Sequence, residues 1–150
     1  GNCTNRSIRF SNQSTISSGT IAAWQWSLGN STASTQFNPV TTYTSAGNYN
    51  VQLQAVSSNG CRSRTETKQI TIDATPVAAF TNSTVCAGSP AVFTANNSMQ
   101  AYWWRFADGT VQTTAQAQKT FNSFGNQLIR LAVTSSQGCV SDTLQQTVPV

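Results

Sequence analysis

The sequence repeats itself, and the second copy follows the first at a spacing of 78 residues. The segment that begins at Trp26 reappears at Trp104, and the same spacing then holds without a gap. The matched positions are Trp26 and Trp104, Tyr43 and Phe121, Gly47 and Gly125, Val51 and Ile129, Leu53 and Leu131, and Cys61 and Cys139. Self-similarity at a fixed spacing indicates repeated structural units. The chain is therefore predicted to form two small domains of one fold.

The upstream parts of the two repeats differ by one insertion. Each repeat has a cysteine seven residues before a phenylalanine, Cys3 with Phe10 and Cys86 with Phe93. From that phenylalanine to the repeated tryptophan there are 16 residues in the first repeat and 11 in the second. The extra residues fall in segment 14–20, which is rich in Ser and Thr and is predicted to be a surface loop.

We expect one domain over residues 1–73 and a second over residues 74–150. The second repeat begins with the apolar segment Pro76–Phe80, which is typical of a first strand. No equivalent segment precedes Cys3, so we expect the first strand of repeat 1 to be missing from this chain. Truncation of the repeat is the plain explanation. The alternative is that a strand from a neighbouring chain or repeat fills that place and gives head-to-tail assembly.

Alternation of apolar and polar residues predicts β-strands. Residues 49–55 place Tyr, Val, Leu and Ala at alternate positions, and residues 129–133 do the same with Ile, Leu and Val. The turn sequences 57–60 and 135–138 follow, each ending in a glycine. No segment has a helical period. Short strands with frequent turns predict an all-β fold of two tandem immunoglobulin-like β-sandwiches.

Composition excludes several classes of protein. Charged residues are 8% of the chain, against about 25% in an average soluble domain. The eight Lys and Arg residues are scattered and give a net charge of +4. They form no stripe or motif of the kind that binds nucleic acid. No apolar run is long enough to span a membrane.

The chain offers no recognisable catalytic or metal-binding set. It has no histidine, and its four acidic residues are far apart in the sequence: Glu66, Asp73, Asp108 and Asp142. Neither a catalytic triad nor an acid–base pair can be assembled from these residues. Calcium needs several converging carboxylates, and zinc needs closely spaced Cys or His ligands. We therefore expect a protein that is not an enzyme and holds no cofactor or metal.

The four widely spaced cysteines, Cys3, Cys61, Cys86 and Cys139, indicate disulfides and an oxidising, extracellular compartment. The default prediction is one bridge per repeat, Cys3 with Cys61 and Cys86 with Cys139. In a strict immunoglobulin topology, however, the first strand corner and the last hairpin lie at opposite ends of a domain. A pairing of Cys3 with Cys139 therefore stays open.

Both repeats resemble the PKD (polycystic kidney disease) domain. The pattern of this family combines Trp-x-Phe-Gly-Asp-Gly with a later Gly-x-Tyr-x-Val-x-Leu-x-Val. Residues 26–31 read Trp-Ser-Leu-Gly-Asn-Ser, and residues 47–53 read Gly-Asn-Tyr-Asn-Val-Gln-Leu. Residues 104–109 read Trp-Arg-Phe-Ala-Asp-Gly, and residues 125–133 read Gly-Asn-Gln-Leu-Ile-Arg-Leu-Ala-Val. The resemblance implies β-sandwich spacers or binding modules of large bacterial surface proteins, such as adhesins and secreted hydrolases.

The resemblance also places Trp26 and Trp104 in the two cores. Because side chains alternate along a strand, Trp103 is then expected to face outwards. Trp103, Trp24 and Tyr102 are the candidates for ligand or interface contact. Thr143, in Asp-Thr-Leu, resembles a short O-glycosylation acceptor of some bacterial secreted proteins.

We expect a structural or adhesive module of an extracellular bacterial surface protein or filament, with other copies or neighbouring repeats as its partners. One alternative is a carbohydrate-binding accessory domain of a secreted hydrolase, which would contact polysaccharide or cell-surface glycans. Another is a protein-interaction module in surface assembly. Two like units with almost no linker favour the first prediction, and an exposed aromatic row would favour the second. The fold itself does not choose among these roles.

Overall fold

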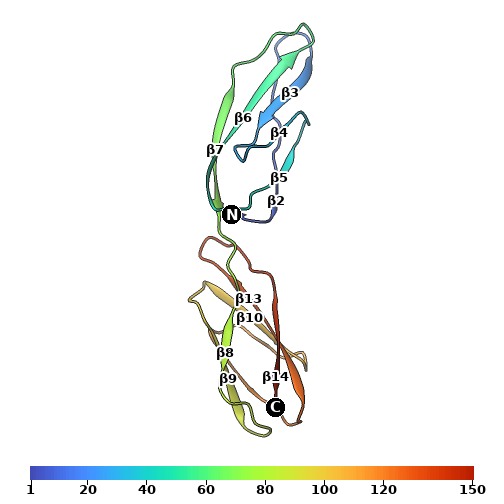
Figure 1. Ribbon diagram of the computed structural model, residues 1–150. Helices are drawn as coiled ribbons and strands as arrows, with labels where there is room; N and C mark the ends of the chain where they lie inside the picture. The colour runs from blue at the N-terminus through green and yellow to red at the C-terminus, as the bar shows by residue number, and fades with distance from the viewer. The chain divides into compact units, whose positions relative to one another are not determined.

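The computed structural model describes all 150 residues and contains strands but no helices (Figure 1). The chain divides into two compact units, unit 1 over residues 1–74 and unit 2 over residues 75–150. Each unit has a larger and a smaller sheet, antiparallel except for one parallel pair in unit 1, the arrangement of an immunoglobulin-like sandwich. The predicted fold class is confirmed. No helix that is long and apolar enough to cross a membrane is found.

The larger sheet of unit 1 has five strands in the order β1-β7-β6-β3-β4. They are β1 (Asn2–Cys3), β3 (Ile21–Ser27), β4 (Ala33–Ser34), β6 (Gly47–Ser57) and β7 (Glu66–Asp73). β1 joins β7 in parallel, and the other neighbours are antiparallel. The smaller sheet pairs β2 (Ser7–Arg9) with β5 (Val40–Thr42). Residues 10–20 form no strand, in agreement with the predicted loop.

Unit 2 has a four-stranded sheet in the order β11-β10-β13-β14 and a three-stranded sheet in the order β12-β9-β8. The first sheet holds β10 (Ala101–Phe106), β11 (Val111–Gln112), β13 (Asn126–Thr134) and β14 (Leu144–Pro149). The second holds β8 (Phe80–Asn82), β9 (Pro90–Ala95) and β12 (Gln116–Thr120). All of these pairings are antiparallel.

The two units differ in their first strand. Six strands of unit 1 have a counterpart in unit 2: β2 and β9, β3 and β10, β4 and β11, β5 and β12, β6 and β13, and β7 and β14. In unit 2 the first strand, β8, pairs with β9 in the smaller sheet. In unit 1 the first strand, β1, lies instead on the larger sheet beside β7. No strand therefore lies beside β2 on the side where β8 flanks β9.

This difference leaves the core of unit 1 smaller. Twelve buried residues form one cluster in unit 2, whereas the cluster of unit 1 contains three, Trp26, Leu28 and Val51. In unit 2 the ring of Phe80, from β8, packs edge-on against Trp104 with the centroids 5.3 Å apart. Unit 1 has no ring in that place. The one ring that packs against its tryptophan is that of Phe10, with the centroids 6.1 Å apart.

Candidate functional site

Trp26 and Trp104 have the same structural role in the two units. Both are buried, and the indole Nε1 of each donates a hydrogen bond to a backbone carbonyl ten residues further along. The acceptors are Gln36 at 3.0 Å and Thr114 at 2.9 Å. The two tryptophans therefore lie in the cores, as expected, and Trp104 is completely covered.

The three aromatic contact candidates do not form one surface. Trp103 is 37% exposed and points away from the core. Tyr102, on the opposite face of β10, is half-buried, and its hydroxyl donates to the carbonyl of Asn97. Trp24 lies in unit 1 and packs edge-on against Phe37 at 4.9 Å. Of the three, only Trp103 is presented to solvent on an open sheet face.

Two arginines share the outer face of β10 and β13 with Trp103. Arg105 follows Trp103 by two residues and is exposed, and in the antiparallel register it lies opposite Arg130. The Nε of Arg130 donates to Gln145 at 3.2 Å, while the Arg105 side chain has no hydrogen bond or ion pair. Like charges directly opposite each other destabilise a sheet unless something else compensates them. Sequence reasoning missed this pair because it depends on the strand register.

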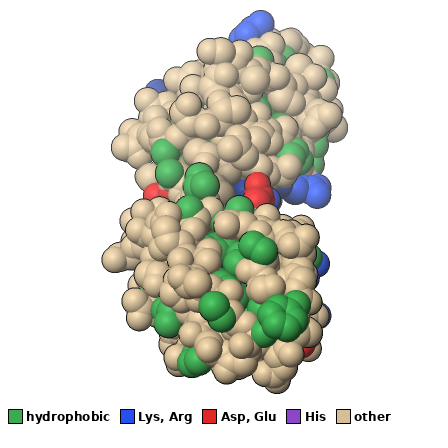
Figure 2. Space-filling view, turned by 60° about the horizontal axis from the view of Figure 1, so that its bottom comes forward, with side chains coloured by type: hydrophobic (Ala, Val, Ile, Leu, Met, Phe, Trp, Pro, Cys, Tyr) green, Lys and Arg blue, Asp and Glu red, His purple; other side chains and the backbone are tan.

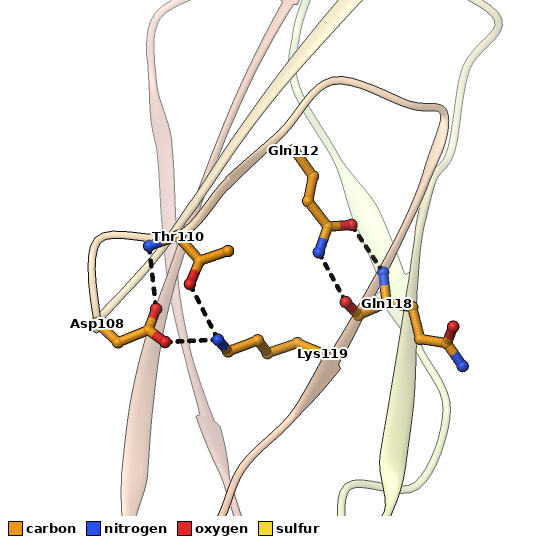
Figure 3. A network of polar contacts seen from close by, with 5 residues as sticks. All are labelled: Asp108, Thr110, Gln112, Gln118 and Lys119. Atoms are coloured by element: carbon orange, nitrogen blue, oxygen red, sulfur yellow. Dashed lines mark hydrogen bonds and ion pairs between the residues drawn. The ribbon is translucent and has the colours of Figure 1, made fainter.

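A polar network lies beside the turn between β10 and β11 (Figure 3). The ammonium group of Lys119 contacts the carboxylate of Asp108 and the hydroxyl of Thr110, and the N–H of Thr110 also donates to Asp108 at 3.0 Å. The Lys119 hydrogen bond, followed by those from Thr110, lowers the pKa of Asp108 to about 2. Beside it, the Gln112 amide bonds both backbone groups of Gln118. These contacts join the turn to β12, so we interpret the network as structural.

The described residues contain no group of three or more His, Cys, Asp or Glu side chains that could hold a metal ion. The face drawn in Figure 2 carries few charged side chains and is mostly polar, with apolar side chains gathered in several places. No catalytic arrangement of side chains is found in either unit.

The predicted disulfides within each repeat are wrong. Cys61 and Cys86 are free thiols, whereas Cys3 and Cys139 are disulfide-bonded. Cys3 lies opposite Asp73, the last residue of β7, while Cys61 lies in the loop ahead of β7. The eight residues of β7 extend for about 26 Å, and a disulfide needs Cα atoms within about 7 Å. These states exclude the pairing of Cys3 with Cys61 and of Cys86 with Cys139.

The cysteines of unit 2 are separated in the same way. Cys86 lies in the connection between β8 and β9, and Cys139 lies in the hairpin between β13 and β14. Cys139 is completely buried, whereas Cys86 is exposed. Cys86 precedes β9, whereas the hairpin of Cys139 follows Thr134, which pairs with Ala101 beyond the other end of β9. The two cysteines therefore lie towards opposite ends of the unit.

Unit 1 contains an open groove of about 650 Å³ between β2 and the inner face of β6 and β7. Its floor is apolar and consists of Trp26, Val51, Leu53 and Ile70. Its rim is charged and consists of Arg9, Arg64, Glu66 and Lys68. From the sequence we expected repeat 1 to lack the counterpart of Pro76–Phe80, but the sequence did not show which side chains would line the resulting space.

The sequence pattern of the PKD domain matches residues 2–72 and again residues 73–150. The chain belongs to the PKD domain family. The resemblance stated from the sequence is thereby confirmed, and units 1 and 2 are two PKD domains in tandem. No curated protein matches the chain.

Among solved structures, the chain is similar to the fibronectin(III)-like modules of CbhA from Clostridium thermocellum. The identity is 14% and the TM-score is 0.47, over 99% of this chain and 87% of that one.

The two PKD domains build the turn after the core tryptophan differently. Unit 1 has Gly29 with φ of +79°, and a Cβ there would lie 2.8 Å from the carbonyl oxygen of Asn50. Unit 1 also has a positive φ at Ser31, of 64°. In unit 2 Ala107 takes the place of Gly29, and only Gly109, the counterpart of Ser31, keeps a positive φ; its N–H donates to the carbonyl of Phe106 at 2.9 Å. The departure of Ala107 from the PKD pattern therefore accompanies a change of turn geometry within the same fold.

Thr143 is exposed and directly precedes β14. Its side chain is thus accessible to a modifying enzyme, and O-glycosylation at this residue stays a prediction.

Proposed function

We propose that the chain is a non-catalytic structural or adhesive module of an extracellular bacterial surface protein or filament. The observation that carries the proposal is the direct succession of two PKD domains, matched over residues 2–72 and 73–150, with no linker between the matches. A spacer needs several like domains in series, whereas a single domain is enough to supply a ligand-binding site. Two successive PKD domains therefore favour the spacer. Neighbouring domains and other copies of the parent protein are then the main partners.

Three further observations support an extracellular role for these domains. Cys3 and Cys139 are disulfide-bonded, which requires an oxidising compartment. Only 8% of the residues are charged, and just eight are Lys or Arg, so the chain offers few cleavage sites to trypsin-like proteases. Most of the basic residues lie in or beside strands, where the backbone is hydrogen-bonded to a neighbouring strand and is therefore less accessible to a protease.

One test deletes the codons for residues 1–150 from the gene of the parent protein. A second test labels intact cells with an antibody against this chain. We expect labelling at the surface, and a deletion strain that secretes its parent protein but attaches less well or assembles shorter filaments. Exclusively intracellular labelling would contradict the extracellular assignment. Unchanged attachment and assembly in the deletion strain would contradict the structural role.

A second candidate function is binding of an acidic polysaccharide on the outer face of unit 2. The exposed ring of Trp103 can stack on a sugar ring, and Arg105 and Arg130 lie opposite each other on the same face. A carboxylate or sulfate group would neutralise these two charges, which makes an acidic sugar a better ligand than a neutral one. This candidate corresponds to the carbohydrate-binding alternative.

Pull-down with alginate, heparin and neutral dextran tests this second candidate. We expect retention by the two acidic polymers, loss of retention in Trp103→Ala, and a weaker interaction in Arg105→Gln. Lys68→Gln, which removes a charge from unit 1, is the matched control and should bind as the original chain does. Equal retention by all three polymers, or none, would reject a site on this face.

A further inference from the structure

The strands β6 and β13 are each followed by a turn of the same backbone geometry. The two turns are residues 57–60, Ser-Ser-Asn-Gly, and residues 135–138, Ser-Ser-Gln-Gly. The glycines have φ of +80° and +83°, and each donates its N–H to the carbonyl of the first serine, at 2.9 Å and 3.0 Å. The N–H of that serine donates to the carbonyl of the following cysteine at 2.9 Å in both turns. The turns thus differ by one residue, Asn59 in unit 1 and Gln137 in unit 2.

Asn59 combines an unrestrained side chain with a glycine as the next residue. Its amide is exposed and makes no hydrogen bond, whereas Gln137 accepts one from the hydroxyl of Ser136 at 2.9 Å. None of the other twelve asparagines of the chain precedes a glycine. Nothing lies within 4 Å of the place that a Cβ of Gly60 would take, so no atom hinders an approach to its backbone nitrogen from that side.

The ring size separates asparagine from glutamine at this place in the turn. The Cγ of Asn59 and the nitrogen of Gly60 can close a five-membered ring, while Gln137 and Gly138 would have to close a less favourable six-membered ring. The Gly60 N–H is bonded to the Ser57 carbonyl, and this bond must open first. Solvent-exposed backbone bonds at a hairpin tip open by local fluctuation.

A third side chain before a glycine is held in place. Asp108 precedes Gly109, whose φ is also positive, at +86°. Its carboxylate accepts hydrogen bonds from Lys119 and Thr110, and its pKa is lowered to about 2 (Figure 3). Asp108 is therefore ionised at neutral pH, and an ionised carboxylate resists attack by a nucleophile. Of the three side chains, only that of Asn59 is both free and reactive.

We propose that Asn59 is a site of spontaneous deamidation. Hydroxide removes the proton of the Gly60 amide, whose nitrogen forms a bond to the Cγ of Asn59. The Cγ–Nδ2 bond breaks, and Nδ2 takes a proton from water and leaves as ammonia, which regenerates hydroxide. Water then opens the cyclic imide at one of its two carbonyls and gives aspartate or isoaspartate. The net reaction consumes one water, releases one ammonia and needs no enzyme.

The reaction changes both the charge and the backbone of the turn. The new carboxylate lies three residues before Arg62 and lowers the net charge of +4 by one. In isoaspartate the backbone passes through Cβ and Cγ, so the turn gains one atom. The amide of Ser57, now bonded to the Cys61 carbonyl, should then exchange its hydrogen faster, while the Ser135 amide of unit 2 should not change. None of this depends on the proposed structural role.

The experiment follows the full 150-residue chain in mildly alkaline buffer made with heavy-oxygen water. Acid formed during the incubation carries the label, and acid formed during later digestion does not. Peptide mapping by mass spectrometry gives the extent of conversion at each asparagine. We expect Asn59 to convert at least about tenfold faster than any other asparagine. Its two labelled products should separate by reversed-phase chromatography.

Exchange of the two turn residues provides a matched pair of variants. Asn59→Gln copies the turn of unit 2 and should abolish conversion in the first turn. Gln137→Asn copies the turn of unit 1 and should create a second site, with a rate within about threefold of that at Asn59. Both positions are exposed, and each replacement already occurs in the other repeat, so both variants are expected to fold.

Two results would overturn the inference. One is that Asn59 converts no faster than the asparagines that precede serine, such as Asn97 and Asn122. The other is that Gln137→Asn adds no second site, because the geometry common to both turns would then not be what permits the reaction.

Discussion

The hydroxyl of Tyr43 donates a hydrogen bond to the backbone carbonyl of Leu28 at 2.6 Å. Tyr43 is 1% exposed, and burial, together with the nearby Tyr49, raises the pKa of its phenol. In unit 2 the equivalent residue is Phe121, and the equivalent carbonyl, that of Phe106, accepts the N–H of Gly109 instead. The two PKD domains thus satisfy the same buried carbonyl by different means.

Replacing Tyr43 by phenylalanine should destabilise unit 1 by about 1 to 3 kcal/mol, because the Leu28 carbonyl loses its partner in a buried place. Phe121 shows that a phenylalanine ring fits this position of the fold. The measurement is the free energy of unfolding from urea denaturation. Tyr49→Phe is the control, since the Tyr49 hydroxyl bonds the Ser45 carbonyl at the surface and its loss should cost less. Equal costs for the two variants would contradict this account.

Gly29→Ala should destabilise unit 1 more than Gly60→Ala. Both glycines have φ near +80°, so each alanine incurs about 1 kcal/mol of backbone strain. Only at Gly29 would the new Cβ also overlap a backbone atom, the Asn50 oxygen at 2.8 Å, whereas nothing lies within 4 Å at Gly60. The difference between the two unfolding free energies therefore measures the close approach of the turn to β6. No difference would mean that the turn shifts freely.

The carboxyl group of Asp108 should titrate with a pKa of about 2. Because its pKa is lower in the folded chain than in the unfolded one, its contribution to stability is present above pH 4. The contribution is lost as the pH falls from about 4 towards 2. Carbon-detected NMR of the side chain gives the value directly. Lys119→Met should raise this pKa, while Lys68→Met, in unit 1, should leave it unchanged. An Asp108 pKa near 4 in the unaltered chain would contradict the network in Figure 3.

Alkylation of the native, unreduced chain should modify two cysteines, Cys61 and Cys86, because these are the free and exposed thiols. Iodoacetamide treatment followed by intact-mass measurement counts the modified residues, and peptide mapping identifies them. We expect Cys3 and Cys139 to react only after reduction. A bridge from Cys61 to Cys3, or from Cys86 to Cys139, would restore the pairing within repeats.

The strands could be predicted because alternation along β6 and β13 is a local property of the sequence. Residues such as Leu131 and Val133 indicate by their spacing alone which face is buried. The two-residue strand β1 could not be predicted, since its parallel pairing with β7 leaves no periodic signal. The same pairing carries Cys3 away from Cys61, which is why the default disulfide assignment was wrong.

The candidate sites needed the strand register as well as the residue types. Trp103 was identified as outward-facing from alternation, but Arg130 joins it only through the pairing of β10 with β13. The basic rim of the groove likewise combines Arg9 from β2 with Lys68 from β7, residues that the sequence separates widely. A surface whose side chains come from two sheets can be recognised only when the positions of both sheets are known.

The parallel pairing of β1 with β7 has a mechanical consequence. Its register joins Asn2 to Ile72 and Cys3 to Asp73, and the N–H of Thr4 adds a bond to Asp73 at 2.9 Å. Tension that pulls residues 1 and 74 apart along the strands therefore loads these bonds in shear, so that they bear the force together and do not open one after another. The first and last strands of unit 1 thus form a clamp against stretching.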